Sequence, residues 1–290
     1  MKADGTLAGW GDNFFGQTTV PSGTFTSVVG GRGHSIGLKS DGTLVAWGDD
    51  GWLQVSDVPS GSFVVVAAGF HHGLAIRTDG SLAGWGKNNF GQATVPSGTF
   101  IAVAGGYDFS IGLRSDGSIE AWGEDTSGQA SPPSGTFTAI AAGWHHGIAI
   151  KSDGTLAGWG DNTYGQMNVP AGTFVAVAAG LDHSLGLRGD GTIVGWGDNT
   201  HGQLNIPSGE YWRLEVGSAS LGHAMAIRGC WVNCDESTGN PALTANDYQC
   251  FINRYAANDP WANCDGSTGN PSLTANDYQC FLNKYAVGCS

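Results

Sequence analysis

The sequence predicts an all-β protein, a six-bladed β-propeller, followed by a small disulfide-rich α-helical module. The first observation is a repeat of 37 or 38 residues, marked by Trp10, Trp47, Trp85, Trp122, Trp159 and Trp196. A period of this length is typical of solenoids and propellers. The second is composition, because 49 glycines and only 13% charged residues suit short strands joined by tight turns. The third is that all six cysteines follow the repeats. We therefore expect two domains, residues 1–229 and 230–290.

The sequence pattern of each repeat unit predicts three strands. In the fifth unit, β-rich stretches lie at 174–180, 183–188 and 192–197. An Asp-Gly pair between the last two stretches is a hairpin signal. The sequence begins with the second half of a hairpin (6–11), and the last unit ends with the first half of one (223–228). We expect these halves to pair, because the closure removes two exposed sheet edges.

The recurring tryptophans are predicted to fill the space between blades. A recurring histidine is predicted to be structural as well, because Phe109 takes its place in one unit and a catalytic or metal-binding role would not tolerate that change. The histidines of this series are His34, His72, His146, His183 and His223.

Function is expected where the repeat varies, which is at two positions in each unit. One lies between the first two strands and the other follows the Trp-Gly pair. Strand direction places both on one face, opposite the Asp-Gly turns. Aromatic residues on rigid loops are enriched at interfaces. The alternative is that some of these rings only pack over the central channel. The predicted partner-binding residues are Phe15, Trp52, Phe70, His71, Phe90, Tyr107, Trp144, His145, Tyr164 and His201.

The phrases WGDNxxGQ, VPSGTF, VAAG and HSLGLRGDGT resemble the regulator-of-chromosome-condensation-type repeat over residues 4–229. The short period and the wording GQTTVP are most similar to the secreted bacterial β-lactamase-inhibitor propeller of that superfamily. In that inhibitor, aromatic residues on one loop face grip the target. The resemblance therefore implies the same role for the aromatic residues predicted above. The inhibitor has seven blades and no Cys-rich tail, so its target is not carried over.

The tail contains a duplicated loop and helix, at Asn233 and again 30 residues later. Alternating oxygen-bearing side chains before a helix predict calcium binding. The candidate ligands are Asn233, Asp235, Ser237, Asp247, Asn263, Asp265, Ser267 and Asp277. This duplication resembles a dockerin, which implies a cohesin-like partner that anchors the protein. The loop has about 15 positions rather than about 12 and lacks the final Glu. The alternative is a stapled helical pair that binds no metal.

The cysteines predict a disulfide framework, and hence a secreted or cell-surface protein with a leader that has been removed or lies outside this sequence. Six cysteines allow 15 connectivities. Repeat symmetry favours pairing Cys234 with Cys250 and Cys264 with Cys280, with Cys230 and Cys289 bracketing the module.

The net charge of −13 argues against a nucleic-acid partner, and no apolar run reaches the roughly 18 residues of a membrane span. The function predicted is a non-catalytic binding protein whose variable face takes a protein or a glycan, with calcium as the one expected cofactor. The alternatives are an enzyme or a purely structural surface component. No nucleophile–base–acid set stands out, and only His71 and His145 are unusual titratable groups on the variable face.

Overall fold

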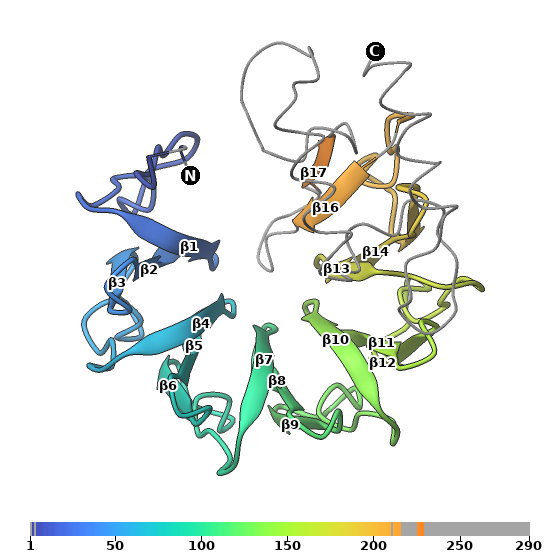
Figure 1. The fold of residues 1–290 in the computed structure, drawn as a ribbon, viewed down its shortest axis with the longest axis horizontal. Coiled ribbons are helices and arrows are strands. Elements are labelled where there is room, and N and C mark those ends of the chain that lie inside the picture. Colours follow the sequence, from blue (N-terminus) through green and yellow to red (C-terminus); the bar gives the residue numbers. More distant parts are fainter. Residues whose placement is uncertain (1, 3, 210, 216–224, 229–290) are drawn as a thin grey trace, which may run out of the picture. The chain divides into compact units, whose positions relative to one another are not determined.

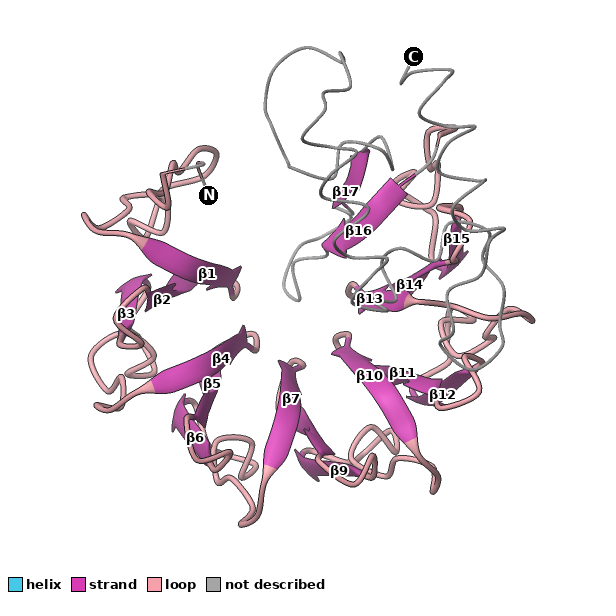
Figure 2. Cartoon of the chain, in the orientation of Figure 1, coloured by secondary structure: helices cyan, strands magenta, loops and turns pink. Residues whose placement is uncertain are grey.

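The computed structural model describes residues 2, 4–209, 211–215 and 225–228, which form strands and loops and contain no helix (Figure 2). The strands are β1 (Phe25–Gly30), β2 (His34–Lys39), β3 (Leu44–Gly48), β4 (Phe63–Ala68), β5 (His72–Arg77), β6 (Leu82–Gly86), β7 (Phe100–Gly105), β8 (Phe109–Arg114), β9 (Ile119–Gly123), β10 (Phe137–Ala142), β11 (His146–Lys151), β12 (Leu156–Gly160), β13 (Ala176–Ala179), β14 (His183–Leu187), β15 (Ile193–Gly197), β16 (Tyr211–Glu215) and β17 (Met225–Arg228). The predicted helices, calcium ligands and disulfides of the tail lie outside the described residues.

Three consecutive strands form one sheet, five times over, from β1-β2-β3 to β13-β14-β15. The first four of these sheets are antiparallel throughout, with a bulge near the start of the first strand. β16 and β17 form a two-stranded sheet. The strands predicted for the fifth unit are confirmed as β13, β14 and β15.

The chain divides into two compact units, which are Met1–Gly186 with Val194–Ile206 and Leu214–Met225, and Leu187–Ile193 with Pro207–Arg213 and Ala226–Ser290. In the first unit, β1, β4, β7 and β10 run in toward a common centre, and the second and third strands of each sheet lie further out (Figure 1). In the second unit, a tight turn at Gly191 accepts a hydrogen bond from the Tyr211 amide, at 2.8 Å.

The hairpin between the second and third strands is set by its Asp-Gly pair. In the first sheet, the Gly42 amide donates to the Lys39 carbonyl at 2.9 Å, and Gly42 has a φ of 82°. An L side chain is strained in this left-handed conformation, so the position requires glycine. The Asp41 carboxylate accepts the Thr43 amide at 2.9 Å. Local sequence alone therefore determines the turn.

Neighbouring repeats are joined at both ends. At the Asp-Gly turn, the Phe63 amide donates to the Gly42 carbonyl of the preceding repeat at 2.8 Å. At the opposite end, the Trp85 indole donates to the Gln54 carbonyl at 3.0 Å. The same indole bond recurs at Trp47, Trp122, Trp159 and Trp196. The structural role predicted for the tryptophans is confirmed at these five, whereas Trp10 is 80% exposed.

The sheets alternate between two packing types. In the first sheet, a side chain at Gly37 would collide with the Phe25 ring, and Gly112 and Gly186 face Phe100 and Phe174 in the same way. In the second sheet, the crowded glycine is Gly73, which faces the Trp85 ring. Gly73 stands two positions earlier in its repeat than Gly37 does in the first. Gly147 and Trp159 repeat this arrangement in the fourth sheet. Close-packed interiors do not admit an extra carbon at such positions. The core consequently lies in separate apolar clusters within and between neighbouring sheets.

His34, His72, His146 and His183 are buried, and two of them contact a serine of the following repeat. The His72 ring lies 2.9 Å from Ser110 Oγ, and the His146 ring lies 2.9 Å from Ser184 Oγ. The structural role predicted for these two histidines is confirmed. His34 differs because Gly73 stands where a serine would be, and neither of its ring nitrogens has a hydrogen-bond partner within the described part of the chain. The repeat after Phe109 likewise has a glycine, Gly147, at the position of the serine.

Candidate functional site: an aromatic loop face

The loop after each Trp-Gly pair is held by a glutamine, which is buried in the middle four loops and partly buried in the first and last. In the fifth of these loops, Gln166 Oε1 accepts the Tyr164 amide at 2.9 Å, and Gln166 Nε2 donates to Asp161 at 2.9 Å. Asn162 Oδ1 accepts the Met167 amide at 2.8 Å. These hydrogen bonds pair polar groups of the loop with one another. The side chain two residues before the glutamine is therefore displayed from a rigid backbone.

The displayed position is aromatic in four repeats. Phe15, Trp52, Phe90 and Tyr164 are 48, 41, 51 and 53% exposed, respectively. Ser127 and His201 hold the equivalent position in the fourth and sixth loops of this series, and both donate their amide to the glutamine in the same manner. The exposed rings follow from the loop chemistry, because the buried glutamine fixes the backbone and leaves no inward position for the ring.

The turns between the first and second strands hold a second set of rings, which contact one another. The Phe70 and Tyr107 centroids are 4.5 Å apart, and Tyr107 and Trp144 are 5.1 Å apart. Trp144 stacks on His145 at 5.3 Å, and Phe70 meets His71 edge-on at 4.8 Å. The backbone of these turns is also continuous, since the Tyr107 amide donates to the Trp144 carbonyl at 3.1 Å. We call these five residues the inner cluster.

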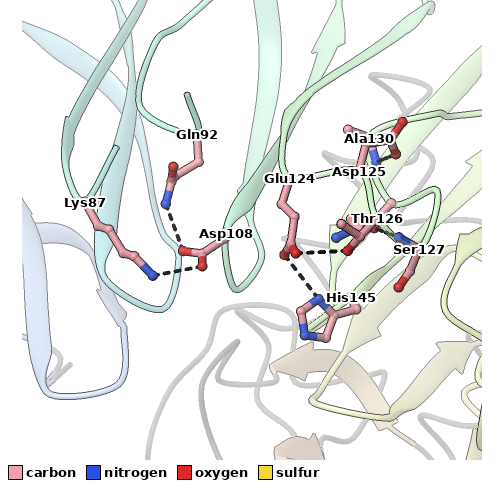
Figure 3. Close-up of polar contacts among 10 residues, drawn as sticks. Lys87, Gln92, Asp108, Glu124, Asp125, Thr126, Ser127, Ala130 and His145 are labelled. Atoms are coloured by element: carbon pink, nitrogen blue, oxygen red, sulfur yellow. Dashed lines mark hydrogen bonds and ion pairs between the residues drawn. The ribbon is translucent and has the colours of Figure 1, made fainter. Parts of the chain in front are cut away.

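Lys87 links the inner cluster to the displayed rings. Its ammonium lies 5.3 Å from the centroids of both Trp52 and Tyr107 and 6.0 Å from that of Phe90. It also bonds Asp108 at 2.8 Å, and Gln92 Nε2 donates to the other oxygen of that carboxylate at 2.8 Å (Figure 3). Both side chains of the ion pair are nearly inaccessible, at 11 and 4% exposure. The ammonium of this ion pair therefore lies close to three aromatic rings at once.

An acidic side chain faces a basic one at three junctions between repeats. Lys87 faces Asp108, and at the next junction Glu124 Oε2 lies 3.8 Å from His145 Nδ1 (Figure 3). The charge of Asp49 acts to raise the pKa of His71. Burial and the charges of Lys87 and Arg32 outweigh this effect, so the pKa of His71 is lowered. His71 is consequently neutral near pH 7.

The predicted partner-binding residues fall into three groups. Ring contacts bring together Trp52, Phe70, His71, Tyr107, Trp144 and His145. Phe90 joins them through Lys87, and Phe15 contacts Phe14 at 4.9 Å. Tyr164 and His201 are exposed, and no ring contact is found for either within the described residues.

Sequence reasoning missed three features of this face. Lys87 and Asp108 were not singled out, although Lys87 stands where four other repeats carry aspartate. Arg32 lies over the Phe70 ring at 5.3 Å. Leu53 replaces the loop glycine, adopts a φ of 63° and is 59% exposed. A left-handed leucine costs about 1–2 kcal/mol relative to an ordinary conformation. Strain of this kind is concentrated at functional positions.

The described residues contain neither a group suited to a metal ion nor a helix suited to cross a membrane. No group of three or more His, Cys, Asp or Glu side chains there is arranged to hold a metal ion. No helix in that part of the chain is long and apolar enough to cross a membrane. The candidate calcium ligands of the tail lie outside this part of the chain.

A comparison with protein families matches the repeats to the family described as the Regulator of chromosome condensation (RCC1) repeat. The matched segments are residues 25–51, 63–92, 100–129, 137–166 and 174–203, which together make up half of the chain. Each segment starts at a phenylalanine at or just before the first strand; the last four end at the loop glutamine, and the first ends at Gly51. No curated protein matches the chain.

Solved structures with this architecture come from several organisms. The ectodomain of the receptor kinase CR4 from Physcomitrella patens is 26% identical, with a TM-score of 0.59, and the match covers 69% of this chain and 58% of that one. Prp20p from Saccharomyces cerevisiae is 18% identical, with a TM-score of 0.57 and coverage of 73 and 65%. Human WBSCR16 is 19% identical, with a TM-score of 0.56 and coverage of 72 and 67%. The chain thus spans less than two thirds of the length of the first two.

Proposed function

The chain belongs to the family of regulator of chromosome condensation (RCC1) repeat proteins, and on this premise we propose that it is a non-catalytic protein that binds another protein through its loop face. The observation that carries the proposal is the set of exposed rings at Trp52, Phe90 and Tyr164, each on a loop held by a buried glutamine. Rigid aromatic side chains lose little conformational entropy on binding. Protein partners are also described for a structural relative, since Prp20 has been crystallised with Kap60 bound.

Replacing Trp52, Phe90 and Tyr164 together by serine is expected to weaken partner binding at least 30-fold, because anchors of this kind each contribute about 2 kcal/mol or more at an interface. The measurement is capture of proteins from the medium and surface extract of the source cells, quantified by mass spectrometry. The control replaces Val64, Ile101 and Val175 by serine. These residues are exposed to a similar degree but lie at the start of the first strands, near the Asp-Gly turns.

Proteins retained by the wild type and by the control, and lost from the triple loop variant, support the proposal. Equal retention by both triple variants would contradict it. Retention of a glycan array in place of proteins, with the same dependence on the loop residues, would favour the glycan alternative. Turnover of a test substrate that depends on His71 or His145 would instead identify an enzyme.

We further propose that six blades close into a ring. Residues 7–11 read LAGWG, as do β6 and β12, which belong to the second packing type. Residues 223–226 read HAMA, close to the HGLA and HGIA of the same type. The two stretches therefore match as parts of one blade, and alternation around a ring requires an even number of blades.

Trp10 provides a test of closure. In a closed ring its indole meets the Gln203 carbonyl, as Trp47 meets Gln17 at 2.9 Å. Trp10→Ala is then expected to lower the free energy of unfolding by about 3–5 kcal/mol, as for Trp85→Ala. Chemical denaturation of the two variants checks this. A cost below about 0.5 kcal/mol at Trp10, typical of an exposed residue, would contradict closure.

Secretion and attachment by the tail are further parts of the proposal. They rest on the cysteines and on the dockerin-like duplication of residues 230–290. Disulfides in this segment fit an oxidising compartment. A cohesin-like partner would then anchor the protein while the loop face stays free to bind.

A further inference from the structure

Charge is distributed unequally between the two faces of the repeats. On the face with the Asp-Gly turns, each acid stands near a base two residues earlier, as in Lys39 and Asp41 or Arg77 and Asp79. On the loop face, Arg32 and Lys87 are the basic residues among the described positions. The acidic residues of that face are Asp12, Asp49, Asp50, Asp108, Glu124, Asp125, Asp161, Asp182 and Asp198. The excess negative charge therefore lies beside the exposed rings.

Hydrogen bonds hold two of the loop-face carboxylates, Asp50 and Asp161, in position and ionised. Burial acts to raise the pKa of Asp50, but amide hydrogen bonds from Ser56 and Val55 outweigh it and leave that pKa below its ordinary value. Burial is likewise outweighed at Asp161, where hydrogen bonds from Thr163 and Gln166 lower the pKa. A hydrogen-bonded carboxylate stays charged. The negative potential at this face is thus a permanent property of the loops.

One junction between repeats pairs two acids, where the three before it pair an acid with a basic side chain. At three successive junctions an acid faces a base: Asp49 faces His71, Lys87 faces Asp108 and Glu124 faces His145. The next junction is different, because Asp161 occupies the position of Lys87 and Asp182 occupies that of Asp108. Burial and the charges of Asp161 and Asp198 raise the pKa of Asp182. Two acids therefore face each other where the preceding junctions pair an acid with a base.

The Lys87 junction shows what a cation contacts in this setting. The ammonium of Lys87 meets a carboxylate at 2.8 Å and the ring of Phe90 at 6.0 Å. Tyr164 is the counterpart of Phe90 at the Asp161 junction, and its ring is half exposed. A ring beside carboxylates is a good environment for an organic cation, through cation–π attraction and charge-assisted hydrogen bonds. The described residues here form no group that suits a metal ion.

We propose that Asp161, Asp182 and Tyr164 receive a lysine or arginine side chain of the protein partner, so that the surface that docks on the loop face is cationic. The inference rests on the proposed function, since it names the chemistry of the partner that the loop face binds. The partner's cation takes the place that Lys87 fills at the equivalent junction two repeats earlier. The rings of Trp52 and Phe90 then contact apolar side chains that flank the cation. Complementary charge also speeds association and selects among partners.

The test uses a defined probe, a phage-displayed library of random 12-residue peptides selected on the whole chain. Enriched peptides are expected to carry lysine or arginine beside apolar residues and to bind less well as salt is raised. Asp182→Asn is expected to weaken them at least tenfold. Asp161→Lys recreates the Lys87–Asp108 arrangement, so it is expected to abolish their binding while raising the denaturation midpoint. Asp153→Asn, on the Asp-Gly face, is the control and is expected to change nothing.

The outcomes separate this inference from the function on which it rests. Peptides that depend on Trp52, Phe90 and Tyr164 but are neutral or acidic, and are unaffected by Asp161→Lys, would overturn the cationic partner and leave protein binding intact. Enriched peptides that ignore all three rings would contradict both. Loss of peptide binding in Asp161→Lys together with a lowered denaturation midpoint would also count against the inference, because a built-in cation should relieve the repulsion between the acids.

Discussion

Acidification from pH 6.5 to 5.5 is expected to lower the free energy of unfolding by about 3 kcal/mol, through three buried histidines. Burial lowers the pKa of His34 to about 4 and that of His72 and His146 to about 3. Above pH 6.5 both folded and unfolded chains hold neutral imidazoles. Below it the unfolded chain takes up protons that the folded chain excludes, which costs about 1 kcal/mol for each histidine over the first pH unit and about 1.4 kcal/mol per unit further down. Stability is therefore lost as the pH falls from 6.5 toward 4.

His34→Phe is expected to remove about a third of this pH dependence and to stabilise the chain at pH 7. Phe109 already occupies the equivalent position, and in both repeats the ring packs on a glycine, Gly31 or Gly106. The substitution also removes two ring nitrogens that lack partners among the described residues, and such atoms cost about 1–3 kcal/mol each when buried. Urea denaturation followed by tryptophan fluorescence, from pH 7.5 to 4.5, is the measurement.

His72→Phe is the matched control for His34→Phe. It deletes the same titrating group but also the contact with Ser110 at 2.9 Å, so it is expected to be the less stable of the two at pH 7. A pH dependence that is unchanged in both variants would show that these histidines titrate normally in the folded state. A greater loss of stability in His34→Phe than in His72→Phe would contradict the assignment of partners.

Asp108→Asn is expected to lower the free energy of unfolding by about 3–5 kcal/mol, because it leaves the Lys87 ammonium without its counter-ion in a nearly inaccessible site. Lys87→Met is expected to cost a similar amount by stranding the carboxylate. The double variant should cost less than the sum of the two. It replaces the ion pair with uncharged groups and leaves neither charge alone. Denaturation of the four proteins forms a double-mutant cycle.

Glu120→Gln supplies the reference for Asp108→Asn. Glu120 pairs with Arg114 at a partly exposed position, where an ion pair contributes about 0–1 kcal/mol. If Asp108→Asn costs no more than Glu120→Gln, the Lys87–Asp108 pair does not hold the rings above it. In that case Trp52 and Phe90 must be positioned by their loops alone.

Much of the fold could be predicted from local sequence. The three stretches of the fifth unit became β13, β14 and β15, and the Asp-Gly pair formed its turn as predicted, because each depends on residues a few positions apart. The choice of face also followed from strand direction. The rings of Phe70, Tyr107 and Trp144, each about 37 residues from the next, meet at one face. The repeat period alone brings equivalent positions of neighbouring repeats together.

Contacts between unlike positions could not be predicted in this way. His72 meets Ser110, whereas His34 meets no serine because the next repeat has glycine there. Lys87 was overlooked because its carboxylate partner lies 21 residues away in the next repeat, at a position that varies freely. Asp161 and Asp182 read as two ordinary loop acids in the sequence. Their mutual proximity is visible only once the repeats are placed side by side.

The sequence by itself determined the repeat, the strands, the turns and the face that varies, since periodicity and turn chemistry act over short stretches of chain. Only the tertiary structure decided how the variable side chains combine. It brought the rings of Trp52, Phe90 and Tyr107 around the Lys87 ammonium and placed like charges together at Asp161 and Asp182. The reason is that these contacts form across repeats, where the stagger of neighbouring sheets, rather than the local sequence, selects which side chains meet.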